Sequence, residues 1–578
     1  MESSGISVLA EDLRSDLINI AREFVADNLP YSFTPDEEMA LKPFFTNLDK
    51  RVFFIHSLPS NVLATLASMY SRLKNRRGIR GVFVDSFLPG ILVGSIELGE
   101  DMDLEVFLKQ HGIKKLNDFL NYSSEARTKF EWFITCAPNE KYLKLLTDSK
   151  KAKKFLNMYL DQYGHNSIAR MGTVWLCFEQ ISILAAKSLE WTRPGAGYVE
   201  LSTRFVDREG AGLYPIEREL GRLGYDESWV KDNLDKLIQS YGELQGEELR
   251  GPFPSFLREK WGTLIEQNGG KVELGVAGET FDVLGNLLPA STLTSVAVAV
   301  SGESLPSILR HLMLDDTAEG NVLVELVVQE AVKIGADQFI RHYQPSQSEV
   351  SGWEYMSTRH IKGINIFENC PSSRLAKNIL WEAFSMSKSD LGDVPARDRD
   401  MKDIAVMLFD GERGEHDKLP REFELVTVPF SGTMSFRGWR DLHRQGFSTH
   451  RRTLLKPNLG FYRYDKPHPS ELSECFKDVE KHSRTFYYEL REVPSRVTQY
   501  ILPMGFKVGF IYSANLRQHE FCNWQRTKPS VNHEVRKVFL AIEKELRFIY
   551  NWWPYFSRAD ITPSYVFARG SAVPLPRS

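Results

Sequence analysis

The sequence has few of the features that mark secreted or membrane proteins. It contains only five cysteines in 578 residues, and no two of them form a C-x-x-C pair. That pattern provides neither a disulfide framework nor a zinc site, and it is typical of a reducing cytoplasm. The N-terminus lacks the basic-then-apolar run of a signal peptide. The most apolar stretch, residues 283–302, is interrupted by Asn286 and Pro289 and is short for a membrane span. We therefore expect a cytoplasmic protein without a membrane segment.

An excess of positive charge is also missing. The net charge of −4 argues against a protein whose main role is to coat nucleic acid. The chain has no Walker phosphate loop, no G-x-G-x-x-G after a strand, no H-E-x-x-H and no convincing nucleophile–base pair, so we expect no metal. Arg-rich stretches such as "HRQGFSTHRR", residues 443–452, keep an accessory factor acting on nucleic acid open as an alternative.

The composition is that of a multidomain globular protein, with 42% apolar and 26% charged residues. A polar segment rich in Gly and Pro, residues 242–276, is expected to be an insertion or loop region. Near the C-terminus, an apolar face at helical spacing predicts a helix that runs from about residue 535 to 549.

The order of elements recurs along the chain. A Leu-Pro pair followed by a β-branched or apolar run occurs at Pro289 and again at Pro503, and both runs predict strands. The distance from Pro289 to Ser301 is 12 positions, as is the distance from Pro503 to Asn515. Likewise, His165 and Arg193 are 28 positions apart, as are His416 and Arg444. These spacings indicate an internal duplication; a coincidence between two generic α+β stretches is the alternative.

The first half resembles the flavin-dependent thymidylate synthase family. That family has a G-H-x-S turn and, some two dozen residues later, the signature R-H-R-x-x-S-x-x-E-x-S-x-R-Y. Here "YGHNSIARMG" contains a similar turn, and "TRPGAGYVELSTRFV" is similar to the signature with its R-H-R triplet reduced to one Arg. The matching residues are Gly164, His165, Ser167, Arg193, Glu200, Ser202 and Arg204.

The second half resembles the same family through its C-terminal segment, where a Leu-Pro strand leads to N-x-R and a later helix begins E-[IV]-R. The matching residues are Asn515, Arg517, Arg526, Glu534 and Arg536. The second half keeps Arg444 but lacks E-x-S-x-R, and the first half has Ser301 and Glu303 in place of N-x-R. Each half therefore lacks the family residues that the other half keeps.

A second match to the signature occurs in "RHYQPSQSEVSGWEY", residues 341–355. No G-H-x-S turn lies about 28 residues before it, and Trp353 replaces the required Arg. We interpret residues 341–355 as a connection between repeats with a chance match.

The resemblance implies an α+β fold of two tandem repeats, with strands and long packing helices. The boundaries would be an N-terminal extension at 1–150, a first repeat at 151–340 and a second, diverged repeat at 341–578. Because the family forms its active sites between subunits of a homotetramer, a fused duplicate would assemble a composite pocket from both repeats. We expect a homodimer that imitates this tetramer.

The implied activity is methylation of dUMP at C5, with methylenetetrahydrofolate as carbon donor, NADPH as reductant and FAD as cofactor, or a related modification of a pyrimidine nucleotide. The resemblance suggests catalytic roles for Arg193 and Glu200. It suggests nucleotide binding by Ser202, Arg204 and Arg526, and flavin binding by the set His165, Ser167, Arg444, Asn515, Arg517 and His533. The alternative is a non-catalytic descendant that binds nucleotides or acts as a scaffold.

Overall fold

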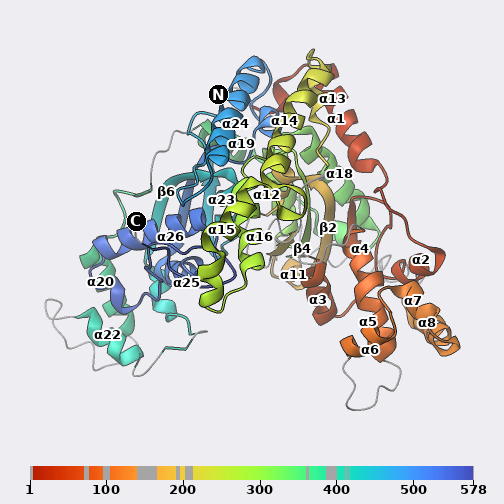
Figure 1. The fold of residues 1–578 in the computed structure, drawn as a ribbon, viewed down its shortest axis with the longest axis horizontal. Helices are drawn as coiled ribbons and strands as arrows, with labels where there is room; N and C mark the ends of the chain where they lie inside the picture. Colours follow the sequence, from red (N-terminus) through yellow and green to blue (C-terminus); the bar gives the residue numbers. More distant parts are fainter. Residues whose placement is uncertain are drawn as a thin grey trace. The chain divides into compact units, whose positions relative to one another are not determined.

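The computed structural model describes residues 4–70, 77–94, 104–139, 166–190, 196–201, 212–358, 364–385, 400–409, 413–414 and 417–576. The protein is a mixed α/β structure with two four-stranded antiparallel sheets (Figure 1). The chain divides into two compact units. The first unit comprises residues 2–230 and 291–350, and the second unit comprises residues 231–290 and 351–578.

The first sheet belongs to the first unit and has the strand order β1-β2-β4-β3. The strands are β1 (Val52–Ile55), β2 (Thr173–Ser182), β3 (Ala196–Glu200) and β4 (Leu293–Ser301). The helices of this unit are α1 (Glu11–Ala26), α2 (Pro35–Leu41), α3 (Ser60–Tyr70), α4 (Gly78–Val82), the π-helical turn Phe83–Phe87, α5 (Leu88–Gly94), α6 (Leu104–Gln110), α7 (Leu116–Leu120), α8 (Ser124–Cys136), α11 (Asn166–Met171), α12 (Ile183–Leu189), α13 (Ile216–Arg222), α17 (Leu305–Leu314) and α18 (Ala318–Val332), with short 3-10 turns at Ile6–Val8 and Ala336–Phe339.

The second sheet has the equivalent strand order β5-β6-β8-β7. The strands are β5 (Asn365–Ile366), β6 (Thr427–Ser435), β7 (Ser448–Arg452) and β8 (Lys507–Asn515). The helices of the second unit are α15 (Pro252–Gln267), α16 (Val272–Leu284), α20 (Ser373–Ser385), α22 (Met401–Leu408), α23 (Phe436–Leu442), α24 (Ser470–Glu489), α25 (Leu516–Arg526) and α26 (His533–Ile549), with 3-10 turns at Glu247–Leu249, Arg421–Leu425, Thr498–Ile501 and Trp553–Tyr555. The chain passes between the units within α14 (Glu227–Gln245), between Ala290 and Ser291, and within α19 (Gln347–Thr358).

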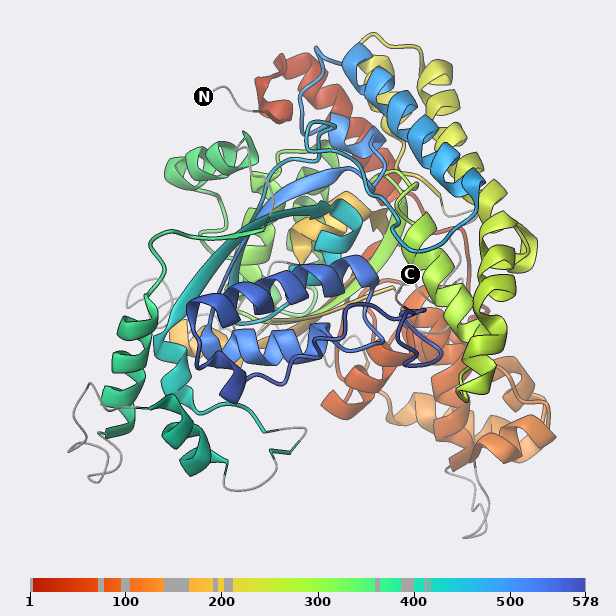
Figure 2. The ribbon, with the colours of Figure 1, turned by 60° about the vertical axis from the view of Figure 1, so that its left-hand side comes forward.

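In the second unit, α25 and α26 lie side by side, and α24 runs along α14 (Figure 2). The predicted apolar face of α26 is confirmed, because Val535, Val538, Phe539, Ile542 and Leu546 are all buried.

The N-terminal residues supply part of the first sheet and its core. Strand β1 pairs with β2, with Phe53 opposite Cys177. Phe53 and Ile55 share one hydrophobic cluster with Cys177 and Ala297 of the sheet and with buried residues of the helices between residues 40 and 130. Residues 40–55 are therefore packed as part of the first unit.

The two sheets have the same register. In the first, Thr173 lies opposite Ser301 and Ser182 opposite Leu293. In the second, Thr427 lies opposite Asn515 and Ser435 opposite Lys507. Strand β2 is one residue longer than β6, and a bulge between Phe178 and Ile181 absorbs the extra residue.

A serine ends the second strand of each sheet and caps the helix that follows. The Ser182 N–H and Oγ donate to Glu319 in α18 at 2.8 and 2.6 Å. The Ser435 N–H donates to Glu534 in α26 at 2.8 Å, and its Oγ contacts the same carboxylate. The same serine–carboxylate pair is therefore built twice.

The two Leu-Pro segments pair with each other. The Ala290 N–H donates to the Leu502 carbonyl, and the Met504 N–H donates to the Leu288 carbonyl, both at 2.9 Å. This exchange places Pro289 opposite Pro503 in an antiparallel bridge. Equivalent positions contact each other reciprocally, as at an interface between identical subunits.

The prediction that residues 242–276 form a loop region is wrong. Helices α15 and α16 occupy most of this segment, with Pro252 at the first turn of α15. Gly246 follows the end of α14 and Gly269 follows the end of α15, with left-handed φ values of 66° and 70°, whereas Gly262 lies inside α15. Pro252, Gly246 and Gly269 therefore mark helix boundaries, because proline is favoured at the first turn of a helix and glycine just after its end.

The S-x-x-E spacing of residues 346–349 is explained by the start of a helix. The Ser346 Oγ accepts the Glu349 N–H at 3.3 Å, and the Ser346 N–H donates to the Glu349 carboxylate at 2.8 Å. This is a capping box at the start of α19, a helix-start pattern that shares its S-x-x-E spacing with the family signature.

Among the described residues, none of the helices is long and apolar enough to cross a bilayer.

Candidate functional site

The predicted site residues fall into two groups. His165, Arg193, Ser202 and Arg204 lie outside the described residues, and of Ser167 the structure describes only its place in α11. Glu200 lies in the first unit, and Arg444, Asn515, Arg517, Arg526 and His533 lie in the second. Convergence of the first-half and second-half sets around one pocket stays a prediction.

Glu200 ends β3 and is part of a buried charge cluster. Its carboxylate accepts from the Lys187 ammonium at 2.7 Å, and Lys187 also contacts Glu190. The side chains of Lys187 and Glu190 are fully buried, and that of Glu200 is almost so. Within the part of the chain that the structure describes, Glu200 forms an ion pair with a lysine. Lys187 is a site residue that sequence reasoning missed.

Arg526, at the C-terminal end of α25, meets the loop between α23 and β7. Its Nε lies 2.8 Å from the side-chain amide of Gln445, whose oxygen accepts from the guanidinium when the amide is oriented toward it. Arg444 in the same loop donates from Nε to the Arg440 carbonyl at 3.1 Å and contacts Asp441. We call Arg444, Gln445, Phe447 and Arg526 the Arg526 corner. The structure thus brings together two residues of the predicted set, through Gln445.

Asn515 and Arg517 hold protein partners at the start of α25. The Asn515 side chain accepts the Gln518 N–H at 2.9 Å and caps the helix. The Arg517 guanidinium donates to the Leu419 carbonyl at 2.5 Å and to the Glu424 carboxylate at 2.6 Å. These contacts give both residues a structural role.

His533 begins α26 and faces a small cavity. Its Nε2 lies 2.6 Å from the Tyr462 hydroxyl, and its Nδ1 lies 3.9 Å from the Glu279 carboxylate. Glu279 also accepts from Lys466 at 2.7 Å and from Tyr464 at 2.9 Å. The cavity beside His533 measures about 10 Å³, which is room for a single water molecule. A flavin ring does not fit there.

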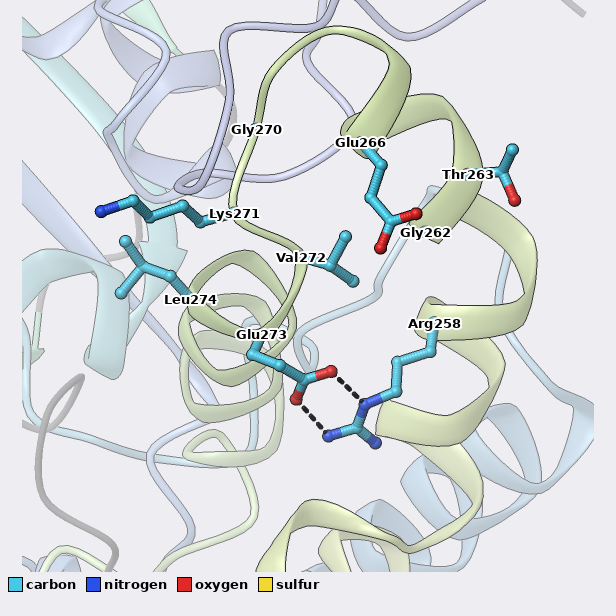
Figure 3. Close-up of a pocket in the computed structure, with 9 residues that line it drawn as sticks. All are labelled: Arg258, Gly262, Thr263, Glu266, Gly270, Lys271, Val272, Glu273 and Leu274. Atoms are coloured by element: carbon cyan, nitrogen blue, oxygen red, sulfur yellow. Dashed lines mark hydrogen bonds and ion pairs between the residues drawn. The ribbon is translucent and has the colours of Figure 1, made fainter.

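A larger groove lies on the α15–α16 hairpin (Figure 3). Its volume is about 670 Å³, and none of the predicted site residues line it. Arg258 and Glu273 face each other across it and form a bidentate ion pair at 2.8 and 2.7 Å. A phosphate would have to displace Glu273 from this arginine, so the groove is a poor candidate for a nucleotide site.

Two buried groups near the Arg526 corner, His450 in β7 and Cys522 in α25, are uncharged. His450 stacks on Tyr512 with ring centroids 5.3 Å apart, and burial lowers the pKa of His450 to about 4. The imidazole is therefore neutral at physiological pH. Burial also raises the pKa of the Cys522 thiol, with weaker opposing effects from Tyr512 and Arg526. Neither residue has the ionisation of a nucleophile–base pair.

Residues 120–331 match the family model described as Thymidylate synthase complementing protein. This segment is therefore similar to that family. The segment includes the G-H-x-S turn, Glu200 and strands β2, β3 and β4.

Relatives that match most of the chain have low sequence identity to it. A UPF0159 protein of Chlamydia muridarum is 25% identical over 542 residues, which cover 89% of this chain and 93% of the relative. The UPF0159 protein Ta1429 of Thermoplasma acidophilum is 24% identical over 450 residues, which cover 70% of this chain and 88% of the relative. The structure of a UMP/dUMP methylase PolB from Streptomyces cacaoi, bound with 5-Br dUMP, matches with a TM-score of 0.28 and 14% identity, over 35% of this chain and 98% of that one. At this TM-score the likeness carries no conclusion.

Proposed function

We propose that the protein modifies C5 of a pyrimidine nucleotide in the manner of a flavin-dependent thymidylate synthase. In its fullest form the reaction is methylation of dUMP with methylenetetrahydrofolate as carbon donor and NADPH as reductant. The observation that carries the proposal is the family match over residues 120–331, the segment that contains the E-x-S-x-R residues Glu200, Ser202 and Arg204.

We infer further that the chain is a fused duplicate with a composite site. The equal strand orders, the equal registers and the repeated serine–carboxylate pairs support the duplication. The reciprocal pairing of the Leu-Pro segments supports fusion of two subunits that once paired symmetrically. In this proposal Ser202 and Arg204 of the first repeat bind the nucleotide together with Arg526 of the second. Two such chains would imitate a tetramer.

The Arg526 corner suits part of a flavin or nucleotide. Guanidinium groups bind phosphate bidentately, and Arg444 and Arg526 are the described residues that would hold it. Asn515, Arg517 and His533 are engaged by the protein and would support the site indirectly. Bound FAD would carry the hydride, while Arg193 would stabilise the negative charge that develops on the uracil carbonyls.

A non-catalytic, nucleotide-binding descendant is the second candidate. The incomplete R-H-R triplet and the burial of Glu200 against Lys187 favour it. Release of tritium from C5-labelled dUMP by the full chain, with FAD, NADPH and methylenetetrahydrofolate, distinguishes the two. We expect release that is lost in Arg204→Ala. Binding of dUMP without release would favour the descendant, and absence of both binding and release would contradict the proposal.

A further inference from the structure

The equal registers of the two sheets permit a second way of pairing the strands. In both sheets the second strand begins opposite the last residue of its partner strand, Thr173 opposite Ser301 and Thr427 opposite Asn515. Backbone hydrogen bonds do not distinguish one sequence from another, so β2 would fit β8, and β6 would fit β4, up to the bulge that follows Phe178. We call this the exchanged arrangement. Repeat proteins misfold in this way, so side chains have to select the native pairing.

An ion pair beside each pair of central strands has the opposite polarity in the two halves. In the first half, Arg170, three residues before β2, donates to Glu303, two residues after β4, at 2.5 and 2.9 Å. In the second half, Glu424, three residues before β6, accepts from Arg517, two residues after β8, at 2.6 Å. The exchanged arrangement would therefore place the two arginines opposite each other, and likewise the two glutamates. Like charges at such positions are unfavourable, whereas the native pairs attract.

A buried contact between the same strands differs in size in the same alternating way. Phe178 of β2 lies opposite Val296 of β4, and both are buried. In the second sheet Gly432 of β6 lies opposite Phe510 of β8, and a Cβ atom on Gly432 would be 2.5 Å from Cζ of that ring. The exchanged arrangement would bring the two phenylalanine rings together on one sheet and leave glycine opposite valine on the other. Overpacking and voids both destabilise a core.

We propose that the ion pairs and the ring contacts together select the native strand pairing, so that each half folds on its own strands. The serine–carboxylate pairs do not select between the arrangements, because they are the same in both halves. The buried ring contacts contribute most of the selection, since exposed ion pairs are weak. This inference goes beyond the proposed function, because it follows from the registers and these contacts and holds for any reaction. It also accounts for Glu303, which stands where the second half has Arg517 of N-x-R.

Refolding of the full chain from urea tests this selection. Sedimentation detects chains joined by exchanged strands, and the native thermal transition measures the chains that recover the native pairing. The first swap, Arg170→Glu with Glu303→Arg, keeps an ion pair in the native structure but gives the first half the polarity of the second. We expect an unfolding midpoint within about 3 °C of wild type and a ratio of exchanged to native chains about two- to tenfold higher, because exposed pairs contribute weakly. Addition of Gly432→Ala with Phe510→Val should raise the ratio further, since Phe178 would then fit β8.

A second swap in the same chain separates selection from a general effect of altered charges. Glu424→Arg with Arg517→Glu, added to the first swap, gives the two halves opposite polarity again and should return the ratio to that of wild type. Arg22→Glu with Glu325→Arg is the matched control, because it reverses an exposed ion pair between α1 and α18 of the first unit, and it should leave the ratio unchanged. A first swap that behaves like the control, a second swap that fails to restore the ratio, or ring substitutions that leave it unchanged would each overturn the inference.

Discussion

At the residue scale, Lys187 is the centre of a buried cluster of opposite charges. It contacts Glu190 and Glu200, and all three side chains are removed from water. Burial of a charge is unfavourable unless partners and hydrogen bonds compensate it, so the cluster depends on all of its members. Glu200 is therefore held in one position at the end of β3, next to the residues predicted to bind the nucleotide.

Loss of Lys187 should destabilise the first unit strongly. We expect Lys187→Met to lower the free energy of unfolding by about 3–5 kcal/mol, because two carboxylates would stay buried without their lysine. Urea denaturation measures this loss. Lys231→Met is the control, since its pair with Asp235 is largely exposed and exposed pairs contribute about 0–1 kcal/mol. Equal effects of the two substitutions would contradict the buried cluster.

Glu219 should make stability depend on pH. Burial raises its pKa to about 8, with the Tyr214 hydroxyl as an opposing hydrogen-bond donor. The folded state therefore keeps a proton that the unfolded state loses above about pH 4.5, and stability falls as the pH rises toward 8. Glu219→Gln should lose less stability than wild type between pH 5 and pH 8, by about 3 kcal/mol or less. Parallel pH profiles of the two proteins would show that Glu219 does not titrate in this way.

At the element scale, the serine–carboxylate pairs connect each second strand to two helices. Ser182 and Ser435 each cap the helix that follows the strand, while Glu319 and Glu534 reach them from α18 and α26. Each serine therefore caps a helix N-terminus and donates to a carboxylate at the same time, and the Glu319 carboxylate is fully buried.

Removal of either serine should have a similar effect. We expect Ser182→Ala and Ser435→Ala each to lower stability by about 1–3 kcal/mol, because the cap and a charged hydrogen bond are lost together. Ser123→Ala is the matched control: Ser123 caps α8 by accepting the Ala126 N–H, and its loss should cost about 1 kcal/mol. Thermal unfolding of the three variants compares them. An effect of Ser435→Ala no larger than that of Ser123→Ala would contradict the proposed role of Glu534.

The sequence predicts elements well where a local pattern determines them. The Leu-Pro starts and the apolar face of α26 are such patterns, and the strands β4 and β8 end at Ser301 and Asn515 as the spacing indicates. The helices within residues 242–276 are not predicted, because Gly and Pro favour loops, whereas here Pro252 begins a helix and Gly262 lies inside one. The contact between Lys187 and Glu200 depends on tertiary packing. The sequence holds one local signal for this cluster: Lys187 lies in α12, and Glu190, three residues later, directly follows that helix.

At the scale of the whole molecule, we propose that the two degenerate halves together supply the residues of one site. The equal registers of the two sheets and the reciprocal bridge at Pro289 and Pro503 support a common origin of the halves. The first half keeps E-x-S-x-R and the second keeps N-x-R, so neither half has the full set of the family. The proposed composite site would account for the residues that each half lacks and the other half keeps.

Dinucleotide and nucleotide ligands should stabilise the chain if the composite site exists. We expect FAD and dUMP together to raise the thermal unfolding midpoint more than either ligand alone, because each binds the folded state only. A thermal scan at saturating ligand measures this, with inorganic phosphate as the control. Equal midpoints with and without both ligands would contradict ligand binding.

The most direct measurement is a double-mutant cycle between Arg204 and Arg526 on the affinity for dUMP, by calorimetry. Both arginines are assigned to the same phosphate, so their effects should not add. We predict that the double variant Arg204→Ala, Arg526→Ala deviates from the sum of the single variants by at least about 1 kcal/mol. Effects that add to within about 0.5 kcal/mol, or a wild-type chain that does not bind dUMP, would contradict the composite site.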